Sequence, residues 1–385
     1  MSRTAMLLVV LISLCSPASA RTWRVEKDGT GDYTVIQDAV DHAASGDTIR
    51  IGPGRFEEKR PYTSYPSTTE KWTFDVYVAV IVSELTIIGS GADQTTIGPP
   101  VRIWQDPEEP KIICALSLVS RLIVEDLALE NVFQGVYRAE HGTLAMRRCE
   151  SRGCKYGVST MSEKGTLLES CRFQDLDEGV LSFSPAKNVE VRLCSFDKCR
   201  ASFDGTINAV VSNCQFQGYT TGCQHANGST GGIYNSTFSG QANVAVVVAT
   251  GSVVDLGDNA LLGGAVNLRV RTSCTVTGSG NVLSGGSTAT IRVCNSSMQF
   301  RGNHILHGSG PSVLIDTGCY QNPPGTTLDL TNNYWGTASA DTIASWILDG
   351  YDNPAIYGYV QFEPFSPVVV PTGKKSLGGV KNLYR

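Results

Sequence analysis

The sequence lacks any apolar run after residue 20 that is long enough to cross a bilayer as a helix. It also lacks an excess of positive charge, with 31 Lys and Arg against 36 Asp and Glu. Nucleic-acid binding favours a clustered basic face, so this balance argues against it. Methionine is scarce, with a count of five, whereas glycine is abundant, with 40. We therefore predict a chain rich in strands and turns, with no nucleic-acid partner and no membrane span.

The start of the chain, from Met1 to Ala20, has the pattern of a cleaved signal peptide. Arg3 supplies a positive start, residues 6–14 form an apolar stretch too short for a bilayer, and residues 18–20 read Ala-Ser-Ala. Removing Arg3 from the 31 basic residues leaves 30 against 36 acidic ones, a net charge of −6. We therefore expect a secreted protein, located outside the cell, in a periplasm or at the cell surface.

A sequence repeat with a nearly constant period fills most of the mature chain. Its markers are Leu127, Cys149, Cys171, Cys194, Cys214 and Ser236, at successive intervals of 22, 22, 23, 20 and 22. Phe173, Phe196, Phe216 and Phe238 stand two positions after four of these markers. Nine positions after each marker stands a small or apolar residue: Val136, Val158, Val180, Phe203, Cys223 and Ala245.

Asparagine marks the later repeats. Asn259, Asn281 and Asn303 follow one another at the same interval of 22, and Asn333 closes the series after a longer one. Within each repeat, apolar residues alternate in steps of two over three to five positions, which is typical of short strands. No repeat has room for a crossover helix, so each one predicts a coil of short strands that stacks on the next. Equivalent residues should then form internal ladders of Cys and of Phe.

The fold class that follows is all-β, a single parallel β-helix. An open stack needs caps at both ends. At the N-terminus, Asp32 or Thr34 should begin a short helix with Ile36, Ala39, Val40 and Ala43 on one face. At the C-terminus, Ser339 precedes Ile343, Trp346 and Ile347. We assign residues 1–20 to the signal peptide, 21–370 to one β-helix domain with its caps, and 371–385 to an exposed tail.

The opening of the mature chain, in residues 23–25, 28–40 and 46–54, resembles right-handed parallel β-helix proteins of the pectin lyase-like superfamily. Residues 85–91 resemble their first coils, and Asn-Asn-Tyr-Trp-Gly-Thr at 332–337 resembles the last coil of bacterial members. The resemblance implies a right-handed coil and a bacterial source. It does not imply one activity, because this superfamily includes lyases, hydrolases, esterases and surface proteins without known activity.

The catalytic motifs of two of these groups are absent. The chain has neither the Asp-Phe-Ile-Phe-Gly segment of pectin methylesterases nor the Gly-His-Gly motif of polygalacturonases. We therefore carry over the fold and no catalytic residue.

Charged residues gather in the turns that follow three neighbouring markers. The strongest cluster comprises Asp175, Asp177, Glu178, Asp197, Lys198 and Arg200. Carboxylates on adjacent coils would lie about 5 Å apart and those on alternate coils about 10 Å, which brackets the separations used by glycosidases. The cluster could form a saccharide site, and it could also hold Ca²⁺. The alternative is a set of solvated turns whose charges pair along the stack.

Histidine and cysteine offer weaker signals. His304 and His307 lack further ligands at metal-binding spacing, so a surface turn is favoured over a metal site. Eleven cysteines remain after cleavage. In-register side chains in a parallel ladder point the same way, which disfavours disulfides between neighbouring coils. We predict mostly free, buried thiols with one or two bridges, and no cofactor beyond the candidate Ca²⁺.

These observations favour a secreted, monomeric β-helix protein that binds carbohydrate or an envelope glycan along its side. A polysaccharide lyase, glycoside hydrolase or pectin esterase-like enzyme that uses the charged turns is the first alternative. A structural module or adhesin is the second.

Overall fold

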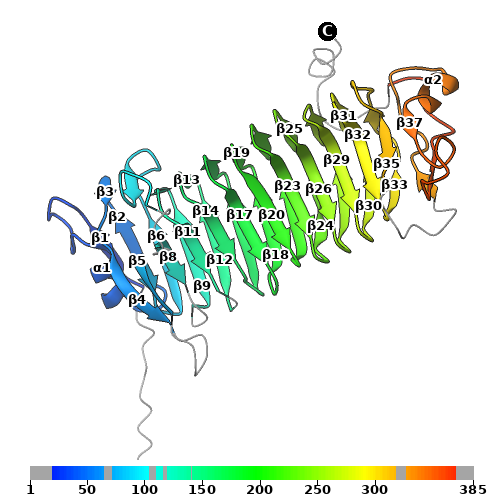
Figure 1. Cartoon of the computed structure of the whole chain (residues 1–385). Helices are drawn as coiled ribbons and strands as arrows, with labels where there is room; N and C mark the ends of the chain where they lie inside the picture. The colour runs from blue at the N-terminus through cyan, green and yellow to red at the C-terminus, as the bar shows by residue number, and fades with distance from the viewer. Residues whose placement is uncertain are drawn as a thin grey trace, which may run out of the picture.

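A computed structural model of the chain describes residues 20–64, 72–103, 110–115, 119–139, 141–317 and 327–369. Through these residues the chain winds repeatedly past three sheets, so that equivalent strands of successive coils lie side by side. Figure 1 shows the elongated stack, with α1 (Ile36–His42) at one end and α2 (Ala340–Ala344) at the other. The predicted all-β solenoid is confirmed. The segments 1–19 and 371–385, which hold the predicted signal peptide and tail, lie outside the described residues.

Sheet A contains 14 strands among the described residues. In spatial order they are β1 (Thr22–Val25), β2 (Thr48–Ile51), β6 (Glu84–Ile88), β9 (Arg121–Glu125), β12 (Thr143–Arg147), β15 (Gly165–Glu169), β18 (Lys187–Arg192), β21 (Ile207–Ser212), β24 (Thr230–Tyr234), β27 (Val253–Gly257), β30 (Thr275–Ser279), β33 (Ser297–Phe300), β36 (Thr327–Asp329) and β38 (Tyr359–Gln361).

Sheet B contains 11 short strands in the same described part. They are β3 (Gly54–Phe56), β7 (Thr95–Ile97), β10 (Ala128–Glu130), β13 (Glu150–Arg152), β16 (Arg172–Gln174), β19 (Ser195–Asp197), β22 (Gln215–Gln217), β25 (Thr237–Ser239), β28 (Ala260–Leu262), β31 (Val282–Ser284) and β34 (His304–Ile305).

Sheet C contains 13 strands within the described ranges. They are β4 (Arg60–Ser64), β5 (Trp72–Val80), β8 (Lys111–Ala115), β11 (Gln134–Arg138), β14 (Tyr156–Thr160), β17 (Glu178–Phe183), β20 (Arg200–Asp204), β23 (Thr221–Ala226), β26 (Val244–Ala249), β29 (Val266–Arg271), β32 (Ala289–Cys294), β35 (Val313–Ile315) and β37 (Ile347–Leu348). Neighbours in this sheet pair in parallel, except that β4 and β5 form an antiparallel hairpin at the N-terminal end.

One continuous internal column joins the cysteine and asparagine markers. At several steps the column residue accepts a hydrogen bond from the backbone of the coil before it. Cys194 Sγ accepts from the Cys171 amide at 3.4 Å, and Ser236 Oγ from the Cys214 amide at 3.1 Å. Asn281 Oδ1 accepts from the Asn259 amide at 3.0 Å. The two sequence markers are therefore two ways of filling the same internal position.

The predicted phenylalanine ladder is confirmed beside this column. The rings of Phe173, Phe196, Phe216 and Phe238 stack in turn, with centroid separations of 5.0, 4.3 and 4.5 Å. All four are buried. Such stacks combine apolar burial with ring contact, and they form the middle of the core.

The predicted register nine positions after each marker is wrong in two coils. Val180 pairs with Ala201, and Cys223 pairs with Val246, instead of with Phe203 and Ala245. The turn before β20 is one residue shorter than its neighbour, and a bulge in β17 adds a second residue of offset. Phe203 therefore lies one row further along, beside His225.

Both predicted caps are present, with shorter helices. Helix α1 begins at Ile36 and buries Ile36, Ala39 and Val40 against the first coils. Ser339 caps α2 by accepting a hydrogen bond from the Thr342 amide. The second helix ends at Ala344, and Ile347 lies in β37 because the chain there adds an edge strand to sheet C.

The cysteines of the described residues are mostly unbridged, as predicted. Nine are free and buried: Cys114, Cys149, Cys154, Cys171, Cys194, Cys199, Cys214, Cys223 and Cys274. Cys294 is in a disulfide bond. Burial raises the pKa of the Cys114 and Cys154 thiols to about 12, so these groups stay protonated at neutral pH.

Candidate functional site

The predicted site residues lie in two successive turns between sheet B and sheet C. Asp175 and Asp177 follow β16, and Glu178 is the first residue of β17. On the next coil Asp197 ends β19, Lys198 lies in the turn, and Arg200 begins β20. The two turns are neighbours, since the Asp175 amide donates to the Asp197 carbonyl at 3.0 Å.

Glu178 and Arg200 form the central contact of this region. They are register partners on adjacent strands, and both project from the outer face of sheet C. Arg200 Nη2 donates to Glu178 Oε1 at 2.6 Å, and Arg200 Nε donates to the same oxygen at 3.2 Å. The Glu178 side chain is 9% exposed, and its second oxygen, Oε2, is buried with no hydrogen-bond partner. A buried, unpartnered carboxylate oxygen is costly and leaves this acceptor without a donor.

The structure does not bring all six residues to one point. Asp175 is 63% exposed and binds Arg102, whose Nη2 lies 2.7 Å from Asp175 Oδ2. Lys198 is exposed. The alternative in which turn charges pair along the stack therefore describes Glu178 and Arg200, whereas Asp175 pairs with an arginine from a distant loop.

A tyrosine missed in the sequence lies beside these carboxylates. Burial raises the pKa of the Tyr219 phenol, and the charge of Asp177 raises it further. Tyr219 follows β22 on the next coil, so it extends the candidate site by one step. The signal in the sequence was weak because the turn around it, Gly-Tyr-Thr-Thr, carries no charge.

Aromatic rings and lysines border Glu178 on the preceding coils. Tyr156 is the register partner of Glu178 on β14, and its ring meets Phe133 edge-on at 5.3 Å. Lys155 Nζ lies 4.8 Å from the Phe133 ring centroid. Further along, Lys111 Nζ lies 4.1 Å from the Phe74 ring centroid. This combination of flat apolar rings and donors is chemistry that suits a sugar ring with hydroxyl groups.

The outer face of sheet C holds two more buried polar atoms without a partner. These are Gln134 Oε1 and Ser202 Oγ. Gln134 uses its amide nitrogen to donate to Ser159 Oγ at 3.2 Å. Gln134 and Glu178 belong to one register row through Tyr156, whereas Ser202 lies in a neighbouring row as the partner of Leu181. The sequence signal for this row was a polar side chain directly before glycine, which recurs once per coil at Gln134, Tyr156 and Glu178.

Metal binding finds no support in the described part of the chain. No group of three or more His, Cys, Asp or Glu side chains there could hold a metal ion. The cluster around Asp175 and Glu178 fails because its carboxylates turn to Arg102 and Arg200 instead of to each other. His304 is buried, and His307 stacks on Trp346 at 4.4 Å.

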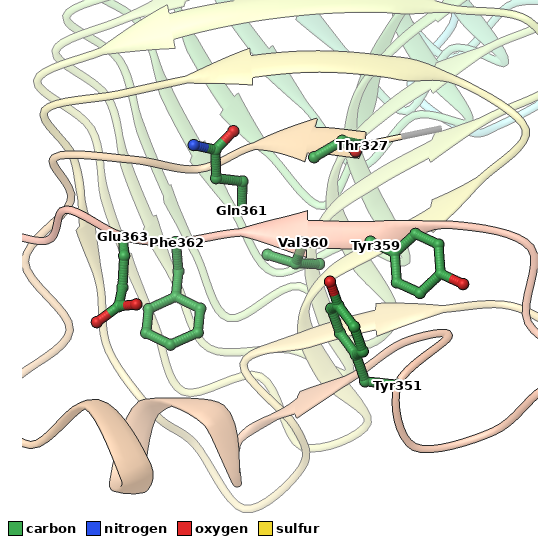
Figure 2. Close-up of a pocket in the computed structure, with 7 residues that line it drawn as sticks. All are labelled: Thr327, Tyr351, Tyr359, Val360, Gln361, Phe362 and Glu363. Carbon is green, nitrogen blue, oxygen red and sulfur yellow. The ribbon is translucent and has the colours of Figure 1, made fainter. Parts of the chain in front are cut away.

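A pocket of about 380 Å³ lies at the C-terminal end of the stack, on strand β38 of sheet A. Figure 2 shows Tyr351 beside Tyr359, and the two ring centroids are 4.6 Å apart. The other lining residues are Thr327, Val360, Gln361, Phe362 and Glu363. The two rings offer a stacking surface, but the pocket is on a different sheet from Glu178.

Comparison with known proteins supports the fold. A family model described as a right-handed β-helix region matches residues 117–261. The chain has the fold of a right-handed β-helix. A search of curated protein sequences gives no match. Among the described residues, none of the helices has the length and apolar character needed to span a membrane.

Two solved structures illustrate the likeness. The A-module of mannuronan C-5 epimerase AlgE4 from Azotobacter vinelandii has a TM-score of 0.51 and 13% identity, over 86% of this chain and 94% of that one. The periplasmic alginate epimerase AlgG has a TM-score of 0.51 and 11% identity, over 88% of this chain and 83% of that one. At these identities the likeness shows a shared fold, which carbohydrate-active enzymes also use.

Proposed function

We propose that this chain binds a polysaccharide along the outer face of sheet C, centred on Glu178. The observation that carries the proposal is the buried Oε2 of Glu178, which has no donor although its sister oxygen holds Arg200. A sugar hydroxyl would supply that donor. The two epimerases named above act on alginate or mannuronan by their names, and their common fold supports a glycan as the ligand class.

The surrounding residues complete the proposed site. Tyr156 and Phe133 give a ring surface on one side of Glu178, and Tyr219 lies on the other. In this proposal Asp175, Asp177, Asp197 and Lys198 form the rim. The rim's contribution is tested with the double variant Asp175→Ala/Asp197→Ala, which should weaken binding less than a change at Glu178.

The central test compares Glu178→Gln with wild type on a glycan array, followed by calorimetric titration of the best hit. The amide keeps the size of the side chain but cannot hold Arg200 as an ion pair or accept as strongly from a hydroxyl. We expect at least about a tenfold loss of affinity, equivalent to about 1.4 kcal/mol.

The matched control for this test is Glu169→Gln. Glu169 also pairs with two arginines, Arg147 and Arg192, but on sheet A. Equal binding by wild type and Glu178→Gln would exclude Glu178 from the site. No hit on the array would favour a structural or adhesive role.

A catalytic function is the second candidate, and the position of Tyr219 near Asp177 favours it. A phenol and a carboxylate in contact with the same ligand could exchange protons with it. Product analysis on the bound glycan separates the cases. New reducing ends indicate hydrolysis, unsaturated ends a lyase, released methanol an esterase, and an unchanged polymer binding alone.

Secretion is part of the same proposal, because the protein would encounter an extended polysaccharide outside the cytoplasm. The pattern of residues 1–20 supports it. N-terminal sequencing of the protein from its native host should begin at Arg21. A mature protein that retains Met1 would contradict this part.

A further inference from the structure

Three arginines gather on the outer face of sheet C, beyond the proposed Glu178 site. Arg269 on β29 and Arg292 on β32 are direct register partners, and Arg271 lies two positions along from Arg269. Asp316 pairs with Arg292 alone, whose Nε donates to both of its oxygens at 2.9 Å. Within the described residues, neither Arg269 nor Arg271 makes a salt bridge or a side-chain hydrogen bond.

This arrangement costs stability when nothing is bound. Like charges directly opposite each other on neighbouring strands repel. Burial lowers the pKa of Arg269, and the charges of Arg292 and Arg271 lower it further. By contrast, Arg147 and Arg200 each bind a glutamate on an adjacent strand.

The surface beside the three arginines is apolar. Five small or branched apolar residues form a cluster there: Ala226 on β23, Val244, Val247 and Ala249 on β26, and Val266 on β29. Val247 is the register partner of Arg269, and Leu314 is that of Arg292. Apolar neighbours lower the local dielectric and strengthen a guanidinium–oxyanion contact. The planar guanidinium fork also matches a carboxylate or sulfate group in two-point hydrogen bonding.

We infer that Arg269, Arg271 and Arg292 form a binding site for the carboxylate or sulfate groups of an acidic polysaccharide. The inference rests on the proposed function, because it names the class of glycan that the same face would take. Figure 1 shows β17, β20, β23, β26, β29 and β32 in succession along this face, so one extended chain can reach both places. The cluster stands out because the whole protein carries a net charge of −5.

The test measures binding of three polymers by biolayer interferometry. They are polygalacturonate, its carboxyl-reduced neutral form, and dextran sulfate. The variant is Arg269→Gln/Arg271→Gln. Its matched control is Arg50→Gln/Arg121→Gln, which removes two exposed arginines without described partners from sheet A.

We expect wild type to bind polygalacturonate or dextran sulfate at least about tenfold more tightly than the neutral polymer. The Arg269/Arg271 variant should lose that preference, with unchanged binding to the neutral polymer, whereas the control should keep it. A preference for polygalacturonate identifies uronate, and a preference for dextran sulfate identifies sulfate. Thermal unfolding of the variant should occur at the same or a higher temperature, because repulsion is relieved. Arg269→Lys, which keeps the charge but loses the fork, should bind with intermediate affinity.

The outcomes separate the two proposals. Equal binding of acidic and neutral polymers by wild type leaves the glycan site at Glu178 standing and overturns the arginine site. Equal losses in the test and control variants also overturn it, because a general effect of charge would then explain the preference. If wild type binds none of the three polymers, both the Glu178 site and the arginine site are overturned.

Discussion

At the scale of single residues, His225 links the core to pH. It is fully buried, its Nδ1 lies 3.1 Å from Ser229 Oγ, and its Nε2 has no partner. Burial lowers the pKa of His225 from 6.5 to about 3. The folded state therefore keeps the ring neutral at pH values where the unfolded chain protonates it.

The prediction is that stability falls as the pH drops from about 6.5 towards 3, and that His225→Phe reduces this fall. The stability that neutral His225 provides is fully present above pH 6.5. Between about pH 6.5 and 3, the free energy of unfolding should fall by a few kcal/mol. Phenylalanine should fit because the histidine ring already lies 4.9 Å from Phe203. Urea unfolding of both proteins at pH 7.5, 5.5 and 4 measures the difference. Parallel pH profiles would show that His225 is not responsible.

Leu193 has a backbone conformation that does not suit its side chain. It lies at φ 56°, in the left-handed region, and it is 56% exposed. The equivalent residues of the next two coils are Asn213 and Asn235, also at positive φ. Asparagine tolerates this conformation better than a branched apolar residue does.

Leu193→Asn should therefore stabilise the protein by about 0.5–1 kcal/mol, seen as a higher thermal midpoint. The control is Ile207→Asn, which removes another exposed apolar residue from an ordinary strand position in β21. That change should be neutral or destabilising because asparagine is disfavoured in strands. A matching gain in the control would assign the effect to the loss of an exposed apolar side chain instead of to the backbone.

At the scale of elements, the asparagine column holds the later coils in register. Asn281 accepts from the backbone and side-chain nitrogens of Asn259, both at 3.0 Å. Its own amide donates to the Leu256 carbonyl at 2.7 Å and to Asn303 Oδ1 at 2.8 Å. Each asparagine thus satisfies buried groups on both neighbouring coils.

Asn281→Leu should cost about 2–4 kcal/mol, because it leaves buried donors and acceptors on both neighbouring coils without partners. Asn281→Ser should cost less, because Ser236 fills the same column and keeps the acceptor. Denaturant unfolding measures both changes. A larger cost for Ser than for Leu would mean that side-chain volume, and not hydrogen bonding, governs this column.

The stack could be predicted from the sequence because every coil repeats the same inward positions. The internal column and the phenylalanine ladder follow directly from the regular spacing of the markers. The misplacement of Phe203 shows the limit, since turn length changes where a residue falls without disturbing the marker that precedes it. The contact of Arg102 with Asp175 joins positions 73 apart in the chain, and no periodic pattern encodes it.

The candidate sites were predictable in part for the same reason. Counting along the repeat placed Glu178 and Arg200 on adjacent coils, and the structure confirms that they meet. Arg269 and Arg292 are separated by one period of the repeat, so the spacing could have paired them. It could not show that Arg269 lacks a carboxylate, because partners come from strands and loops outside the repeat.

At the scale of the whole molecule, the stack fixes the distance between the two proposed sites. Four steps along sheet C separate β17, which carries Glu178, from β29, which carries Arg269. Parallel strands are about 4.8 Å apart, so the sites are about 19 Å apart along the stack. A rigid solenoid thus sets a minimum length for any glycan that occupies both.

Binding should therefore depend on oligosaccharide length in a stepwise way. Oligogalacturonates too short to span about 19 Å should bind weakly, because they reach one site at a time. Longer ones should gain about tenfold or more, since the second contact becomes intramolecular. Calorimetry over a size series should show this step in wild type and in Arg50→Gln/Arg121→Gln. Arg269→Gln/Arg271→Gln should lose the step while keeping wild-type affinity for oligomers that fill the Glu178 site alone. A smooth increase with length that is identical in all three proteins would mean that the chain binds acidic glycans without using the two sites together.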